Sequence, residues 1–159
     1  MKRPKIGDII EIATSKGFGY AQYSHKHPTH GYMLRVFRPI FAERPQSFDL
    51  LAQSEPGFIT FFPLGAAVNR NIVAIAGHAA LPASAEAFPL FRTGIIDPKT
   101  GKIDLWWLWD GDTEWRAGKL SPDQYDLPLR GIINDTLLIE YIETGWAPAT
   151  DRHYGRLNR

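Results

Sequence analysis

The sequence predicts an α+β fold in which mostly antiparallel strands form a strongly curved, partly open barrel-like sheet with short flanking helices. Three observations carry this prediction. Short apolar runs rich in aromatic and β-branched residues follow one another closely and are separated by Gly and Pro turn signals. Glycines interrupt the early runs, which is typical of strands that bend. Segments with helical periodicity are few and short.

The first half of the chain is predicted to consist mainly of strands. Residues 7–13 alternate weakly and are followed by the turn signal Ser15-Lys16-Gly17. Residues 18–23 then alternate large and small side chains, which is typical of a strand whose two faces differ. The remaining elements expected in this half are strands over 31–38, 58–62 and 72–77, a short helix over 45–53 and one helical turn over 64–69.

The second half is predicted to begin with a three-stranded antiparallel meander. Residues 97–102 place Pro and Gly where a type I turn with a following bulge requires them, and they join strands over 91–96 and 103–110. A second turn over 110–113 leads into a strand over 114–119. Two helices are expected after it, a short one that begins at Ser121-Pro122 and one over 134–144 that Asn134 or Asp135 caps and Gly145 ends.

Length and hydropathy set the expected organisation and location. A chain of 159 residues that is 44% hydrophobic predicts one α+β domain over residues 1–150, followed by a flexible basic tail over 151–159. No window approaches the roughly 18 apolar residues of a membrane helix. Charges interrupt the first apolar segment, which argues against a signal peptide. We therefore expect a cytoplasmic protein without a membrane partner.

Composition excludes several classes of function. The chain has no cysteine, which rules out a disulfide framework, a thiolate zinc site, an iron–sulfur cluster and a cysteine nucleophile. Its net charge of +1 gives no global field that would attract nucleic acid, so we do not expect a nucleic-acid partner. The phosphate-loop, dinucleotide and serine-hydrolase motifs are absent from the sequence. No cofactor is expected on these grounds.

Charge is nevertheless unevenly spread along the chain. Residues 1–44 hold eight basic and three acidic side chains, whereas residues 104–143 hold nine acidic and three basic ones. One interpretation is that the opposite blocks partly neutralise each other in the fold or form a solvated face. The other is an acidic surface that binds a basic partner, where complementary charge would speed association.

The acidic stretch also holds four of the five tryptophans. Alternation over residues 105–109 makes both faces of this strand apolar, so the strand either lies in the core or exposes tryptophan at a binding edge. Both interpretations stay open at the level of sequence. The candidate partner-binding residues are Trp107, Trp109, Asp110, Asp112, Glu114 and Trp115.

A histidine cluster is the main candidate for metal chemistry. His25, His27 and His30 fall within six residues, and imidazoles at such spacing can share a divalent metal. The sequence places no carboxylate close by to complete the site. An exposed connection between two strands, with Pro28 and Gly31 as turn residues, explains the same pattern. A pH-sensitive or phosphate-contacting loop is a third interpretation.

Residues 5–12, followed by residues 17–23, resemble the opening of the immunity protein 26 family of bacterial polymorphic-toxin systems. That family label is shared with small proteins described as organophosphate hydrolases of a phosphotriesterase type. Phe61-Phe62-Pro63-Leu64 and Phe88-Pro89 are also similar, so the likeness extends from residue 5 to about residue 115. Ala13 departs from the pattern, in which proline often follows the first strand.

The resemblance implies a small non-enzymatic protein that binds and neutralises a cognate toxin domain. The alternative that it implies is a metal-dependent hydrolase of phosphotriester-type substrates. A divalent metal held by His25, His27 and His30 would then activate water by lowering its pKa. His25-Lys26-His27 matches the His-x-His of barrel phosphotriesterases, but such a barrel needs about 250 residues, more than this chain has.

Overall fold

The computed structural model describes residues 2–156, and their contacts gather into two compact units. Unit 1 combines the chain up to Ala87 with residues 131–145. Unit 2 combines residues 88–130 with the segment that begins at Trp146. Each unit is therefore built from two stretches of chain that are distant in sequence.

The predicted domain boundaries can be compared with these units. That residues 1–150 form a single domain stays a prediction. Of the predicted tail, residues 157–159 lie outside the described residues. Residues 151–156 make hydrogen bonds within unit 2, where the N–H of Gly155 donates to the carbonyl of Asp151 and that of Arg156 to the carbonyl of Ala149, at 2.9 and 2.7 Å.

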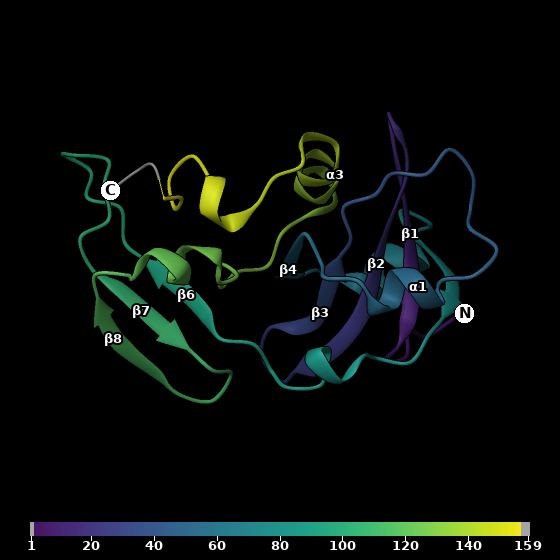
Figure 1. The fold of residues 1–159 in the computed structure, drawn as a ribbon, viewed down its shortest axis with the longest axis horizontal. Helices are drawn as coiled ribbons and strands as arrows, with labels where there is room; N and C mark the ends of the chain where they lie inside the picture. The colour runs from purple at the N-terminus through teal and green to yellow at the C-terminus, as the bar shows by residue number, and fades with distance from the viewer. Residues whose placement is uncertain (1, 157–159) are drawn as a thin grey trace. The chain divides into compact units, whose positions relative to one another are not determined.

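Unit 1 is built on a five-stranded antiparallel sheet (Figure 1). Its strand order is β4-β3-β2-β1-β5, so the first two hairpins of the chain occupy its centre. Gly17 closes the first hairpin with φ of 127°, a conformation that glycine adopts readily. The strands are β1 (Asp8–Thr14), β2 (Gly17–His27), β3 (Gly31–Val36), β4 (Phe58–Phe61) and β5 (Ala74–His78).

Three helices accompany this sheet, namely α1 (Asp49–Gln53), α2 (Leu64–Asn69) and α3 (Asp135–Thr144). Helix α3 packs closely on the hairpin, because a Cβ placed on Gly19 would lie 2.9 Å from Cγ2 of Ile142. Gly19 therefore lies where α3 comes close to the backbone of β2. The core of unit 1 includes Ile9, Tyr20, Phe37, Phe48 and Ala52.

Unit 2 contains the three-stranded antiparallel meander predicted from the turn signals, in the order β6-β7-β8 (Figure 1). The outer edge of β6 is covered by backbone hydrogen bonds. The carbonyl of Arg92 accepts the N–H of Arg130, and the N–H of Arg92 donates to the carbonyl of Pro128, both at 2.9 Å. Strand β8 forms the other edge. The strands are β6 (Phe91–Gly94), β7 (Trp106–Trp109) and β8 (Glu114–Gly118). Unit 2 also has 3-10 turns at Pro122–Asp126 and Pro148–Thr150, and a further one at Ala83–Ala85 belongs to unit 1.

A fully buried arginine lies at the centre of unit 2. The guanidinium of Arg92 donates hydrogen bonds to four backbone carbonyls and stacks 4.8 Å from the ring centroid of Trp106. Burial lowers the pKa of Arg92 to about 10, so the side chain remains charged at neutral pH. The four acceptors are the carbonyls of Tyr125, Leu127, Pro148 and Tyr154.

The α+β class and the antiparallel strand pairing are confirmed. The strongly curved, barrel-like shape is not, since neither sheet closes on itself within residues 2–156, and it stays a prediction. Several strands are shorter than predicted, as in β7, which begins at Trp106 rather than at residue 103. Among the described residues, no helix has the length and apolar character that crossing a membrane requires.

Candidate functional site

The predicted partner-binding tryptophans differ in exposure. Trp109 is only 3% exposed, and its ring packs 5.4 Å from Phe91 and 5.6 Å from Phe88, measured between centroids. Trp107 is half-buried, with the guanidinium of Arg116 5.6 Å from its ring. Trp109 therefore belongs to the interior of unit 2, while Trp107 keeps part of its surface accessible.

Trp115 is the exposed tryptophan of the set. It lies on β8, paired in register with Leu108 of β7, and 41% of its surface is exposed. Its neighbours Glu114 and Arg116 are also exposed. This part of β8 thus presents a large aromatic side chain between two opposite charges on an edge strand.

Asp110 shapes the turn between β7 and β8. Its carboxylate accepts the backbone N–H groups of Thr113 and Asp112 at 2.8 and 2.9 Å. The hydrogen bonds from Thr113 and then Asp112 hold the pKa of Asp110 below its ordinary value. Gly111, with φ of 98°, supplies the bend. Asp110 and Asp112 are both exposed to solvent, but the carboxylate of Asp110 is engaged in hydrogen bonds within the turn.

Glu114 forms an ion pair inside unit 2. Its Oε2 lies 2.6 Å from a guanidinium nitrogen of Arg130, whose own plane lies 4.2 Å from the ring centroid of Trp109. Trp109, Arg130 and Glu114 therefore contact one another in that order, with the arginine in the middle. Part of the Glu114 charge is thus compensated within the unit.

The acidic stretch predicted from the sequence is divided between the two units. Residues 104–130 belong to unit 2 and residues 131–143 to unit 1. The described residues of unit 2 hold eight acidic and eight basic side chains, and those of unit 1 hold nine of each. Within unit 1, Glu143 accepts the N–H of Ser15 at 2.8 Å. The equal numbers of acidic and basic side chains in each unit favour the interpretation that opposite charges partly neutralise each other in the fold.

The three clustered histidines do not converge on one point. The ring of His25 bonds the hydroxyl of Ser24 at 3.0 Å and the carbonyl of Glu86 at 2.9 Å. The rings of His27 and His30 pack against each other, with centroids 5.1 Å apart. Within residues 2–156, no group of three or more His, Cys, Asp or Glu side chains is arranged to hold a metal ion. The hydrolase alternative stays a prediction.

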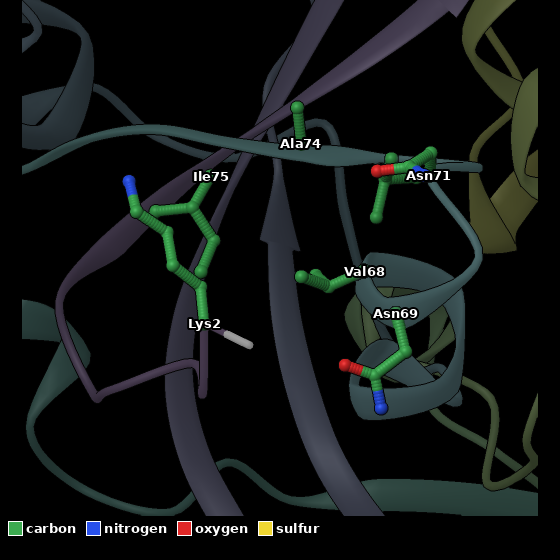
Figure 2. A pocket seen from close by; sticks show the side chains of 7 residues that line it. Lys2, Val68, Asn69, Asn71, Ala74 and Ile75 are labelled. Carbon is green, nitrogen blue, oxygen red and sulfur yellow. The ribbon is translucent and has the colours of Figure 1, made fainter.

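Unit 1 also has a surface pocket of about 470 Å³ that sequence reasoning missed (Figure 2). Lys2 and Ile75 lie at one side of it, and Val68 and Asn69 of α2 at the other. Its lining combines one ammonium group and two amides with apolar side chains. No motif revealed it, because its residues come from separate segments of the chain. The lining residues are Lys2, Val68, Asn69, Asn71, Val73, Ala74 and Ile75.

A carboxylate–imidazole pair was likewise not predicted. Nδ1 of His78 lies 2.9 Å from Oδ1 of the buried Asp8, while 59% of the imidazole is exposed. The other oxygen of Asp8 accepts the N–H of Lys5 at 2.8 Å, which fixes the carboxylate. The pair joins β1 to β5 and orients the imidazole toward solvent. Seventy residues separate its members, so no spacing motif signals it.

Comparisons of the chain with protein-family models, with curated proteins and with solved structures each give no match.

Proposed function

We propose that this protein is a non-enzymatic binding protein of the immunity type, which binds and neutralises a cognate toxin domain in the bacterial cytoplasm. The observation that carries the binding role is the exposed edge of unit 2, where Trp115 is 41% exposed on β8. Tryptophan is enriched among the residues that dominate binding energy at protein interfaces. The choice of a toxin as partner rests on the resemblance of residues 5–12 and 17–23 to the immunity protein 26 family.

Under this proposal the residues of the edge have different roles. Trp115 packs against the partner and excludes water there. Asp112 attracts a basic partner, and the uncovered oxygen of Glu114 accepts a second donor. Asp110 and Trp109 act indirectly, because the first shapes the turn and the second supports the sheet from within unit 2. We term Trp107, Asp112, Glu114 and Trp115 the β8 edge surface.

Truncation of Trp115 tests the proposal most directly. The protein encoded by each adjacent reading frame is titrated calorimetrically with the wild-type protein and with Trp115→Ala. Loss of a central aromatic contact is expected to raise Kd by about thirtyfold or more. Because the side chain is partly exposed, the free energy of unfolding should change by less than about 1 kcal/mol.

Ile95→Ala is the matched control, since Ile95 is an apolar residue of unit 2 that is 77% exposed outside the β8 edge surface. Its Kd should equal that of the wild type. A Trp115→Ala protein that binds the toxin domain with unchanged Kd removes the β8 edge surface as the binding site. A toxin domain that fails to bind the wild-type protein at all contradicts the immunity role itself.

A further inference from the structure

Strand β8 has a free side. Within the described part of the chain, β8 pairs only with β7, whereas the opposite edge of the sheet is covered by the bonds of Arg92 to Pro128 and Arg130. Glu114, Trp115 and Arg116 are exposed along it. An uncovered edge presents backbone donors and acceptors that can pair with a further strand.

Hydrogen-bonded and non-bonded residue pairs alternate along the β7–β8 hairpin, and this alternation determines which residues of β8 present backbone N–H and C=O groups at the free edge. The N–H of Asp110 donates to the carbonyl of Thr113 at 3.2 Å, and bonded pairs alternate along an antiparallel ladder from there. Trp115 is therefore in a bonded pair with β7, and its own backbone groups are used. Glu114 and Arg116 are in non-bonded pairs, so their N–H and C=O groups point away from β7.

The backbone hydrogen bonds at the opposite edge of the sheet agree with this alternation. Arg92 of β6 pairs in register with Leu108, which in turn pairs with Trp115. The backbone N–H of Arg92 points away from β7, toward the carbonyl of Pro128. Alternation across the three strands is thus consistent, and the outward direction assigned to Glu114 and Arg116 follows from it.

The exposed triplet Glu114-Trp115-Arg116 is complementary to itself. When two copies run antiparallel with Trp115 at the two-fold axis, Glu114 of each copy lies opposite Arg116 of the other. These are the residues with outward backbone groups, so each pair exchanges both hydrogen bonds at the point where the charges attract. Trp115 falls in the non-bonded position, where Cα atoms lie about 4.5 Å apart and side chains meet.

We propose that the protein forms a two-fold symmetric homodimer through β8, which joins two three-stranded sheets into one continuous sheet. Edge charges usually prevent such pairing, but in this register they favour it. The contact is small beside a standard interface of about 1,600 Å², so the dimer is weak and reversible. It goes beyond the proposed function, because it needs no toxin, and a toxin bound at the same edge would displace the second copy.

Sedimentation velocity over a concentration series tests the dimer in the absence of any partner. The wild-type protein should shift from monomer to dimer as its concentration rises. Arg116→Glu places two carboxylates opposite each other twice per dimer, and Glu114→Arg does the same with two guanidinium groups. Each variant alone should associate about tenfold more weakly. An equimolar mixture of the two restores both attractive pairs and should form a heterodimer.

Arg152→Glu is the control, because it makes the same charge change as Arg116→Glu at an exposed arginine of unit 2 that lies outside β8 and its preceding turn. It should leave the association unchanged. A wild-type protein that stays monomeric at every concentration overturns the proposal, as does a mixture that associates no better than either variant. Either result leaves the toxin-binding proposal standing, since no toxin is present in the experiment.

A cysteine placed on the two-fold axis tests the register independently. The chain contains no cysteine, so Trp115→Cys introduces its only thiol. A Cα separation of about 4.5 Å permits a disulfide, and mild oxidation should give a covalent dimer. Asp112→Cys, in the exposed turn away from the axis, should cross-link about tenfold more slowly. Equal rates for the two variants would exclude the proposed register.

Discussion

Arg92 shows how one side chain can organise a whole unit. Its guanidinium donates hydrogen bonds to four backbone carbonyls, and it lies against Trp106. Such a charge is tolerated inside a protein only when hydrogen bonds replace its hydration. No sequence pattern indicated it, because Arg92 interrupts a strand in the way that any solvent-facing residue does.

Arg92→Met is expected to destabilise the protein strongly. Methionine fills most of the volume but donates no hydrogen bond, so four carbonyls lose the bond that Arg92 donates and the free energy of unfolding should fall by about 3 kcal/mol or more. Urea unfolding followed by tryptophan fluorescence measures this change. Arg152→Met, an exposed arginine of the same unit, should cost less than about 0.5 kcal/mol. Equal costs for the two variants would show that Arg92 has no special role.

Asp112 is the residue of the β8 edge surface where charge alone should matter. Asp112→Lys is expected to slow association with the toxin domain several-fold and to weaken its salt dependence, while the dissociation rate changes little. Stopped-flow binding at two ionic strengths measures both rates. Asp123→Lys reverses an exposed charge outside this surface and should leave them unchanged. If Asp112→Lys and Asp123→Lys slowed association equally and with the same salt dependence, the role of Asp112 would be contradicted.

At the scale of elements, local turn chemistry made the hairpins predictable. The signal at Ser15-Lys16-Gly17 and the turn over 110–113 correctly marked the β1–β2 and β7–β8 connections. Strand ends were less accurate, because β6 ends at Gly94 and β7 begins only at Trp106. The predicted turn between them is closed by the N–H of Asp97, which donates to the carbonyl of Lys102 at 2.8 Å. The alternation over residues 105–109 also predicted that both faces of this strand are apolar, but it did not show which face is exposed to solvent.

Helix α3 was predicted from its caps, and its stability should depend on them. The side chain of Asn134 accepts the N–H of Leu137 at 2.8 Å, and Gly145 ends the helix with φ of 66°. Asn134→Ala removes the N-cap bond and should lower the free energy of unfolding by about 1 kcal/mol. Thr136→Ala, an exposed first-turn substitution, should be neutral or slightly stabilising in the same denaturation experiment. A neutral Asn134→Ala would indicate that packing on the sheet alone holds α3.

Over the whole molecule, three carboxylates link stability to pH. Hydrogen bonds hold the pKa of Glu11, Asp110 and Glu143 below their ordinary values of 4.5, 3.8 and 4.5, through Arg44, Thr113 and Ser15 respectively. A pKa that is lower in the folded state adds stability above the unfolded pKa, and this stability is lost as pH falls through the folded pKa.

The free energy of unfolding should therefore change little between pH 7 and about pH 5 and decline below about pH 4.5. Urea midpoints measured across this range test the prediction. Glu11→Gln should make the decline shallower, because it removes the carboxylate that binds Arg44 and Tyr20. A stability that rises on acidification below pH 4.5 would contradict the assigned pKa directions.

The division into two units was beyond sequence reasoning. Residues 131–145 return to unit 1 and the segment from Trp146 returns to unit 2, and such long-range pairings carry no local signature. The pocket near Lys2 and the pair formed by Asp8 and His78 share this property. By contrast, strand alternation and the acidic stretch indicated that the tryptophan-rich hairpin lies either in the core or at a binding edge, and its division into buried Trp109 and exposed Trp115 required the structure.

The returning segment has a consequence for synthesis of the chain. Two of the carbonyls that bind the Arg92 guanidinium, those of Pro148 and Tyr154, follow it by 56 and 62 residues. At a translation rate of about 5–20 residues per second, Arg92 leaves the peptidyl-transfer centre roughly 3–12 seconds before its last acceptor is made. During that interval a nascent unit 2 holds an incompletely bound charge, so its folding is completed late, and that delay offers chaperones a defined window in which to bind it.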